Sequence, residues 1–264
     1  MRNNNMRIAL GVEYDGHEFF GWQAQKKLLT VQGSLEIALS HIANEEIKTF
    51  CAGRTDAGVH ATGQVIHFET SAQRDLRAWT LGVNAKLPRA ISVSWSQVVD
   101  ENFHARFSAL SRRYRYVICN SRTRPAISAK RATWYHYPLN IEAMNEAGKL
   151  LIGECDFTSF RSSECESRTP MRNVHYITVT RHDEFVVIEI QANAFLHHMV
   201  RNIAGVLMRI GSGLKNPQWA KEVLDARDRC RAAETASPDG LYLCHVEYSQ
   251  IYQLPTTDKK ILLL

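Results

Sequence analysis

The sequence predicts an α+β protein with a mainly antiparallel, mixed sheet flanked by helices. Several segments alternate apolar and polar residues with the period of two that is typical of half-buried strands, and others repeat apolar residues at helical spacing. Both kinds of segment are mixed along the chain, without the regular strand–helix alternation of a doubly wound parallel sheet. We therefore expect two similar lobes, residues 1–106 and 107–264, with a substrate cleft between them.

The first lobe is expected to begin with a strand over residues 6–14, MRIALGVEY, which ends at the turn formed by Asp15 and Gly16. Apolar residues at helical spacing predict a helix over residues 31–42, with Thr30 as its N-cap. The other elements expected here are short strands over residues 47–51 and 64–69, a helix over residues 75–87 that stops before Pro88, and a strand that alternates Ile91, Val93 and Trp95 with serines.

The second lobe is expected to begin with a strand over residues 112–119. Its period of two places Tyr114, Tyr116 and Ile118 on one face. The remaining expected elements are a helix over residues 141–152 with Asn140 as N-cap, a hairpin of residues 174–181 and 185–191, a long helix over residues 195–210, a helix that starts at Asn216 and Pro217, and a last strand over residues 241–248.

Positive charge is concentrated in the middle of the chain. The sequence has 32 Lys and Arg against 27 Asp and Glu, a net charge of +5. Residues 102–141 contain no acidic residue but carry eight Lys or Arg, with aromatic residues among them. A charge run is most often a solvated face, but a long stretch with one sign of charge and interleaved aromatic rings suits a polyanion better.

Several function classes find no support in the sequence. Six cysteines are scattered without C-x-x-C spacing, H-E-x-x-H is absent, and the adjacent His197 and His198 would point to different sides of a helix. There is no P-loop, no nucleophile elbow and no apolar run near the ~20 residues that span a bilayer. The N-terminal segment has no apolar signal core. We expect a cytoplasmic protein with reduced thiols and no metal.

The stretch CAGRTDAGVHATGQ, residues 51–64, contains the first candidate for chemistry. Its glycines allow a sharp turn and the close approach of a ligand. Asp56 is either a turn residue or a catalytic carboxylate on a loop, and spacing alone favours the turn role. Arg54 has no role in such a turn, and His60 adds a further polar group to the same loop as a substrate-binding candidate.

Two residues of the second lobe have a structural and a functional interpretation each. Tyr114 is either a core tyrosine or a platform on which a base stacks. Arg201 borders the apolar stripe of the long helix, so it either extends its stem along the surface or, if buried, needs an anion. Asp56 would be a suitable anion, since a nearby cation keeps a carboxylate ionised.

Four segments together resemble the TruA family of pseudouridine synthases. They are GRTDAGVHATGQVIHFET, FHARFSALSRRYRYVI, DFTSFRSSECESRTPMRNV and NAFLHHMVRNIAGVLMRIG. The likeness runs in order along almost the whole chain, and the G-R-T-D-A-G-V-H core is highly specific. The resemblance implies the pseudouridine synthase fold and an isomerase that needs neither cofactor nor metal. It would exchange the N1–C1′ glycosidic bond of a uridine in tRNA for a C5–C1′ bond.

The resemblance also implies roles for individual residues. Asp56 would be the essential nucleophile, Tyr114 would lie against the target base and assist proton transfer, and Arg201 would pair with the aspartate. Arg54 would hold the flipped nucleotide. The target would lie on the 3′ side of the anticodon stem-loop, at tRNA positions 38 to 40, and the family works as a homodimer. Two alternatives stay open: an RNA-binding protein without catalysis, and a metal-dependent phosphoryl-transfer enzyme acting on RNA.

Overall fold

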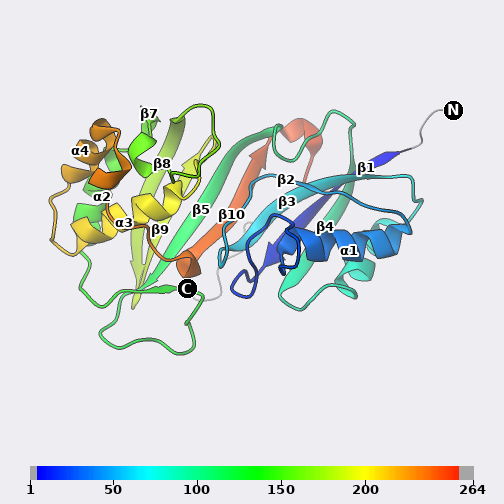
Figure 1. Cartoon of the computed structure of the whole chain (residues 1–264), viewed down its shortest axis with the longest axis horizontal. Coiled ribbons are helices and arrows are strands. Elements are labelled where there is room, and N and C mark those ends of the chain that lie inside the picture. Colours follow the sequence, from blue (N-terminus) through cyan, green and yellow to red (C-terminus); the bar gives the residue numbers. More distant parts are fainter. Residues whose placement is uncertain (1–4, 256–264) are drawn as a thin grey trace. The chain divides into compact units, whose positions relative to one another are not determined.

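The computed structural model describes residues 5–255, in which strands and helices follow one another as expected of an α+β protein (Figure 1). These residues form two compact units, one of residues 5–110 and 243–255 and the other of residues 111–242. The expected division lies after residue 106, whereas in the structure the first unit extends to residue 110 and the chain returns to it at residue 243. It returns because strand β10 (Leu241–Tyr248) lies beside β3 (His60–Thr70) in the sheet order. Residues 256–264 of the expected second lobe lie outside the described residues.

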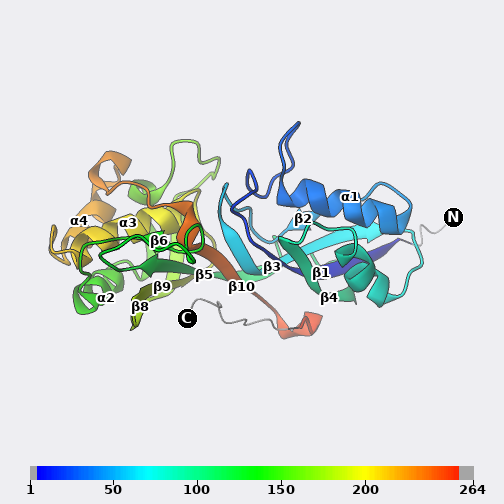
Figure 2. The same ribbon diagram turned by 90° about the horizontal axis from the view of Figure 1, so that it is seen from below.

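The first unit contains one set of strands. They are β1 (Met6–Tyr14), β2 (Phe50–Cys51), β3, β4 (Ile91–Val99) and most of β10, in the order β4-β1-β3-β10 with β2 paired to β3. Strand β1 pairs antiparallel with β3 and β4, and β2 pairs antiparallel with β3. The helix α1 (Val31–Ala43) covers one face of these strands (Figure 2). Thr30 caps α1 as predicted, because its side chain accepts a hydrogen bond from the Gly33 amide.

Two predicted elements of this unit differ in detail. The predicted strand over residues 47–51 is reduced to the two residues of β2. The predicted helix over residues 75–87 is helical only over residues 76–84, and its middle is the π-helical turn η1 (Ala78–Gly82). The fully buried ring of Trp79 anchors that turn to the core, where it meets Phe68 edge to face at 5.2 Å.

The second unit contains a second antiparallel set of strands. They are β5 (Ala109–Cys119), β6 (Thr133–Trp134), β7 (Gly153–Asp156), β8 (Met171–His182) and β9 (Phe185–Ala192), in the order β5-β9-β8-β7, with β6 alone parallel to β5. The predicted hairpin is confirmed, since His182 pairs with Phe185 across a two-residue turn whose first residue, Asp183, has φ of 51°.

Three helices accompany these strands: α2 (Ile141–Lys149), α3 (Met199–Gly211) and α4 (Trp219–Ala226). Asn140 caps α2 as predicted, accepting from the Ala143 amide at 2.9 Å. The long helix α3 begins at Met199 and not at residue 195, because His198 has φ of 63°, a left-handed conformation that interrupts a right-handed helix. Most of α3 is buried, so this helix forms the centre of the unit's core.

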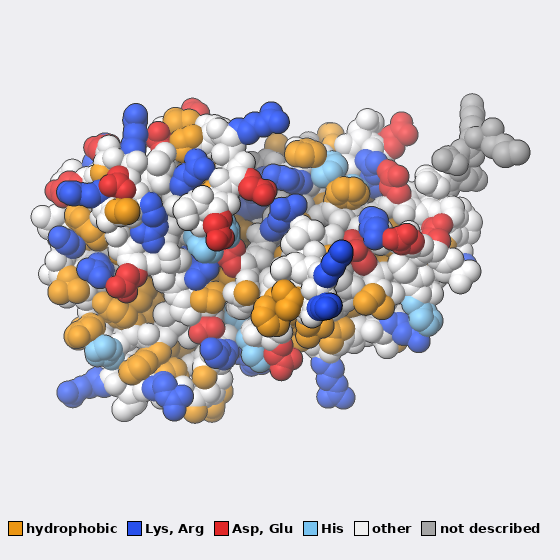
Figure 3. Space-filling model, viewed as in Figure 1, with side chains coloured by type: hydrophobic (Ala, Val, Ile, Leu, Met, Phe, Trp, Pro, Cys, Tyr) orange, Lys and Arg blue, Asp and Glu red, His pale blue; other side chains and the backbone are white. Residues whose placement is uncertain are grey.

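Charged side chains of both signs share the surface drawn in Figure 3. Part of the predicted basic stretch is neutralised within the second unit: the Arg115 guanidinium donates to the Glu189 carboxylate at 2.6 Å, and Lys130 lies 3.9 Å from Asp239. The acid-free sequence thus overstates the charge available to a polyanion. Among the described residues, none of the helices combines the length and the apolar character needed to cross a membrane.

Candidate active site

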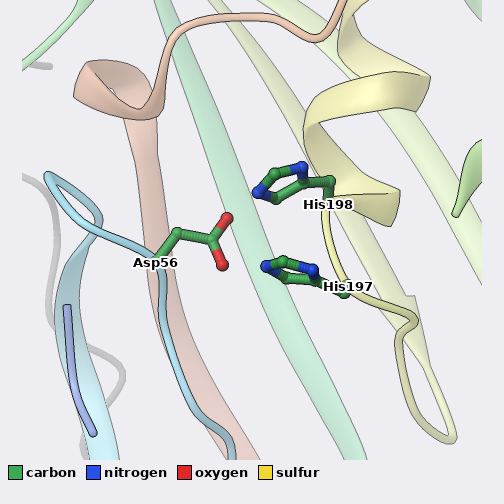
Figure 4. Close-up of side chains that lie close together, drawn as sticks. All are labelled: Asp56, His197 and His198. Carbon is green, nitrogen blue, oxygen red and sulfur yellow. The ribbon is translucent and has the colours of Figure 1, made fainter. Parts of the chain in front are cut away.

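Asp56 lies on the loop that joins β2 to β3, and its carboxylate projects from that loop (Figure 4). The backbone carbonyl of Asp56 accepts a hydrogen bond from the Val59 amide at 3.1 Å, and Gly58 has φ of 79°, as a type II turn requires at its third position. The turn is therefore closed by the backbone of Asp56. The turn interpretation of the sequence assumed that the Asp56 side chain closes the turn, but the backbone hydrogen bond closes it without the side chain.

The base of this loop is fixed by Gln64, whose side chain is fully buried. Its Nε2 donates to the Gly53 carbonyl at 2.7 Å, and the Gly53 amide donates to its Oε1 at 3.4 Å. One side chain thus satisfies both backbone groups of a residue outside the strand ladder. A buried amide with both ends paired holds the backbone in one position, so Gln64 limits the movement of the loop that carries Asp56.

A second segment, residues 14–22, packs against the same loop. The Trp22 amide donates to the Thr55 carbonyl at 2.9 Å, and the Tyr14 hydroxyl lies 2.7 Å from the buried Thr55 Oγ1. The sequence did not reveal this support, although the glycines in YDGHEFFGW signal a backbone that approaches another segment closely. Gly21 has φ of 83°, and a Cβ atom there would lie 2.9 Å from the Thr55 carbonyl oxygen.

Replacing Gly21 by Ala is expected to lower both stability and turnover. The left-handed backbone and the contact with Thr55 should cost about 1–3 kcal/mol, measured by urea unfolding. Gly213→Ala is the matched control, because Gly213 has φ of 79° but open space where a Cβ atom would lie. If the two variants lose equal stability and equal activity, the contact with Thr55 has no effect on the loop.

His60, a predicted substrate-binding residue, is 2% exposed at the start of β3. Its Nδ1 accepts a hydrogen bond from the Gly16 amide at 3.0 Å and lies 3.1 Å from the Asp15 carboxylate. Burial alone would raise the pKa of Asp15, but its interactions with the His60 ring and with the side chain and amide of His17 outweigh burial and hold that pKa well below its usual range. These contacts favour a supporting role for His60, and its contact with substrate stays a prediction.

Arg54, by contrast, is exposed on the loop two residues before Asp56. The side chains of residues 54, 56 and 60 thus differ in accessibility: exposed, half-buried and buried, respectively. An exposed guanidinium beside a half-buried carboxylate can contact a phosphate or base of a ligand that the carboxylate reaches. The first unit therefore supplies one candidate acid–base or nucleophilic group and one candidate anion-binding group on a single anchored loop.

Tyr114 lies on β5 in the second unit, where it pairs with Ile190 of β9. Its ring is 8% exposed and meets Phe195 edge to face, with centroids 5.0 Å apart and an interplanar angle of 83°. This aromatic contact fixes the orientation of the ring. Both interpretations of Tyr114 are compatible with this position: the ring is mostly buried, yet part of it is accessible.

Arg201 lies on α3 in the first turn of the helix. Its Nε donates to the Ala236 carbonyl at 2.8 Å, and the Ala236 amide donates to the Arg201 carbonyl at 3.3 Å. Its charge acts on the buried Tyr116 hydroxyl, whose pKa is raised by burial and lowered in part by Thr133 and Arg201. Arg201 is therefore a partly buried, oriented cation, and its pairing with Asp56 stays a prediction.

His197 and His198 lie on the segment that leads into α3, and their rings lie beside each other (Figure 4). The ring centroids are 4.0 Å apart. The prediction that the two side chains point to different sides of a helix is wrong, because the helix begins only after them and His198 has a left-handed backbone. The prediction from sequence spacing placed both histidines inside a helix, so it could not show that their rings lie beside each other.

Comparison with known proteins identifies the family of this chain. A family model described as tRNA pseudouridine synthase matches residues 11–108 and 147–249. The chain belongs to the tRNA pseudouridine synthase family. Proteins named tRNA pseudouridine synthase A from Tolumonas auensis and Photorhabdus laumondii are each 57% identical over 250 residues, covering 95% of this chain and 96% and 95% of theirs. The family resemblance inferred from the four sequence segments is thus confirmed.

A solved archaeal box H/ACA Nop10–Cbf5 complex is only distantly similar to this member of the tRNA pseudouridine synthase family. The sequence identity is 14% and the TM-score is 0.34, over 76% of this chain and 44% of that one.

The candidate residues are distributed unevenly over the family match. Arg54, Asp56 and His60 lie in its first range and Arg201 lies in its second, whereas Tyr114 lies between the two ranges.

Proposed function

We propose that the chain isomerises uridine to pseudouridine in tRNA, with Asp56 as the catalytic nucleophile. The observation that carries the proposal is the anchored loop within the family match, which presents the half-buried Asp56 carboxylate (Figure 4) two residues after the exposed Arg54. In the reaction the N1–C1′ bond of the target uridine breaks and a C5–C1′ bond forms. The proton on C5 is lost and N1 gains one, so the product is an isomer and no co-reactant is consumed.

Asp56 acts as an anion in this proposal, by attack at C1′ or C6 or by removal of a proton. A nucleophilic carboxylate must be ionised when it attacks, and a neighbouring guanidinium favours that form. The target nucleotide must leave the base stack before its glycosidic bond can be reached, at a cost of a few kcal/mol. Arg54 would stabilise the extruded nucleotide through its phosphate or base.

The second unit contributes the other two proposed groups. Tyr114, held by Phe195, would lie against the target uracil and assist proton transfer. Arg201, oriented by Ala236, would pair with Asp56 and keep it ionised. The detached uracil must be retained until it has turned and reattached, which requires a pocket that excludes water.

Several finer features belong to the same proposal. The target uridines lie on the 3′ side of the anticodon stem-loop of tRNA, at positions 38 to 40. The enzyme works in the cytoplasm as a homodimer and uses no metal and no organic cofactor. Basic side chains on the surface bind the phosphate backbone, so tRNA affinity should fall steeply with rising salt concentration.

The proposal is tested by release of tritium from tRNA labelled at uracil C5. The purified protein should release tritium with multiple turnovers, and nuclease digestion should give pseudouridine in equal amount. The rate should not change in excess EDTA, with monovalent salt high enough to keep the tRNA folded. Binding of tRNA without release would identify the alternative, an RNA-binding protein that lacks catalysis, and a loss of activity in EDTA would identify a metal-dependent reaction.

A further inference from the structure

Four rings of the first unit form a cluster that the proposed reaction does not use. We call Phe50, His67, His104 and Phe107 the aromatic platform. His67 stacks on Phe50 with centroids 5.1 Å apart and lies 4.6 Å from the ring of His104, which lies 4.4 Å from that of Phe107. His67 is 2% exposed, but Phe50 and Phe107 are 51% and 75% exposed. The cluster therefore runs from the core to the surface and ends in two accessible phenyl rings.

The exposed end of the aromatic platform is held in a fixed turn. The His104 Nδ1 accepts hydrogen bonds from the amides of Arg106 at 3.1 Å and Phe107 at 3.4 Å. The His104 amide donates to Ser108 Oγ at 2.9 Å, and the Ser108 amide donates back to the His104 carbonyl at 2.9 Å. A ligand that stacks on Phe107 thus meets a backbone that is already ordered, which lowers the entropy cost of binding.

The imidazoles in the aromatic platform are uncharged near neutral pH. Burial, with the positive charge of Arg7 and the neighbouring His104, lowers the pKa of His67 to about 4. Burial and the guanidinium groups of Arg7 and Arg106 also lower the pKa of His104. The flat faces of the cluster are therefore neutral and apolar, while a cation lies at its edge: the Arg106 guanidinium carbon is 5.5 Å from the centre of the Phe107 ring.

The aromatic platform is connected to the loop that carries Asp56. Phe50 directly precedes Cys51 on β2, and the loop starts at the next residue. Burial raises the pKa of the Cys51 thiol to about 12, and the charges of Arg54 and Arg106 oppose this rise in part. The charges of Arg106, in the aromatic platform's turn, and Arg54, on the Asp56 loop, thus both act on the Cys51 sulfur atom.

We propose that the aromatic platform binds an unpaired nucleobase of the RNA substrate, which stacks on Phe107 with Phe50 beside it, while Arg106 binds an adjacent phosphate. The identity of the ligand as tRNA rests on the proposed function. Aromatic rings that bind single-stranded nucleic acid are exposed, fixed and bordered by cations, and the platform has these three properties. The Arg106 guanidinium over the Phe107 ring suits a ligand that combines a flat base with a phosphate, so the charge favours a nucleotide over the apolar face of a second protein.

The experiment measures binding of an unmodified tRNA transcript in the Asp56→Asn background, so that turnover does not affect the result. Phe107→Ala should weaken binding about 5- to 150-fold, and Phe107→Trp should restore it, because either ring supports stacking. Ile37→Ala is the control: Ile37 is also 75% exposed, on α1 of the same unit, and its loss should have no effect. Circular dichroism verifies that each variant folds.

Salt dependence separates the two contacts. Arg106→Gln should reduce the slope of log affinity against log salt by about one, whereas Phe107→Ala should lower affinity at every salt concentration and leave the slope unchanged. Wild-type affinity in Phe107→Ala would overturn the proposal. So would a change in the oligomeric state of Phe107→Ala with unchanged RNA affinity, since the aromatic platform would then be an interface between two copies. Absence of pseudouridine with wild-type protein would instead overturn the proposed function.

Discussion

Asp56→Asn is expected to abolish pseudouridine formation and to leave tRNA binding almost unchanged. Asparagine has the shape of aspartate but no anionic oxygen, so it cannot act as the nucleophile or base. The turn should survive, because the Val59 amide is bonded to the backbone carbonyl of residue 56 and not to its side chain. Loss of a nucleophile typically costs at least about 10⁴-fold in rate, which tritium release detects easily.

The matched control for this prediction is Asp75→Asn. Asp75 is exposed in the same unit, and its carboxylate accepts a hydrogen bond from the Arg77 amide at 2.7 Å, a contact that asparagine retains. Its turnover should equal that of the wild type. Asp56→Ala, which cannot revert by deamidation, should be as inactive as Asp56→Asn. Turnover at the wild-type rate in Asp56→Ala would remove Asp56 from the mechanism, whatever its position on the loop.

Local chemistry explains which elements the sequence predicted well. Thr30 and Asn140 satisfy amides only three residues away, at Gly33 and Ala143, so their role as caps is visible in a short window. Strand β1 and strand β10 occupy the predicted residues, because the short apolar runs that predict them are local too. Asp56 is a candidate on local grounds as well, since the motif that contains it is a continuous stretch.

What the sequence did not predict depends on contacts between distant residues. The hydroxyls of Tyr14 and Thr55 are 41 residues apart, and no periodicity relates them. The return of the chain to the first unit depends on the place of β10 beside β3, which strand propensity does not specify. The predicted start of α3 is wrong for another reason. The left-handed backbone of His198 is a conformation of a single residue, and the apolar stripe of the helix does not reveal it. Tyr114 and Arg201 therefore keep their roles as proposals, because those roles too depend on long-range geometry.

Replacing Gln64 by Leu is expected to have the largest effect on stability. Leucine fills a similar volume but leaves the Gly53 amide and carbonyl without the two hydrogen bonds that Gln64 makes to them. An unsatisfied buried polar group costs about 1–3 kcal/mol, so the free energy of unfolding should fall by about 2–5 kcal/mol in urea titrations. Turnover should fall more than tRNA affinity, because the loop that presents Asp56 loses its anchor while the phosphate contacts persist.

The decisive comparison is with Gln97→Leu. Gln97 is a half-buried glutamine on β4 in the same unit, where it pairs with Ala9 of β1, and its Nε2 donates to one backbone group, the Tyr252 carbonyl, at 2.9 Å. Both of these partners lie outside the Asp56 loop, so the replacement should cost about 1 kcal/mol and leave turnover unchanged. Equal losses of turnover in both variants would mean that general destabilisation slows the reaction. A loss confined to Gln64→Leu ties the rate to the position of Gly53, and through it to the carboxylate three residues further along the chain.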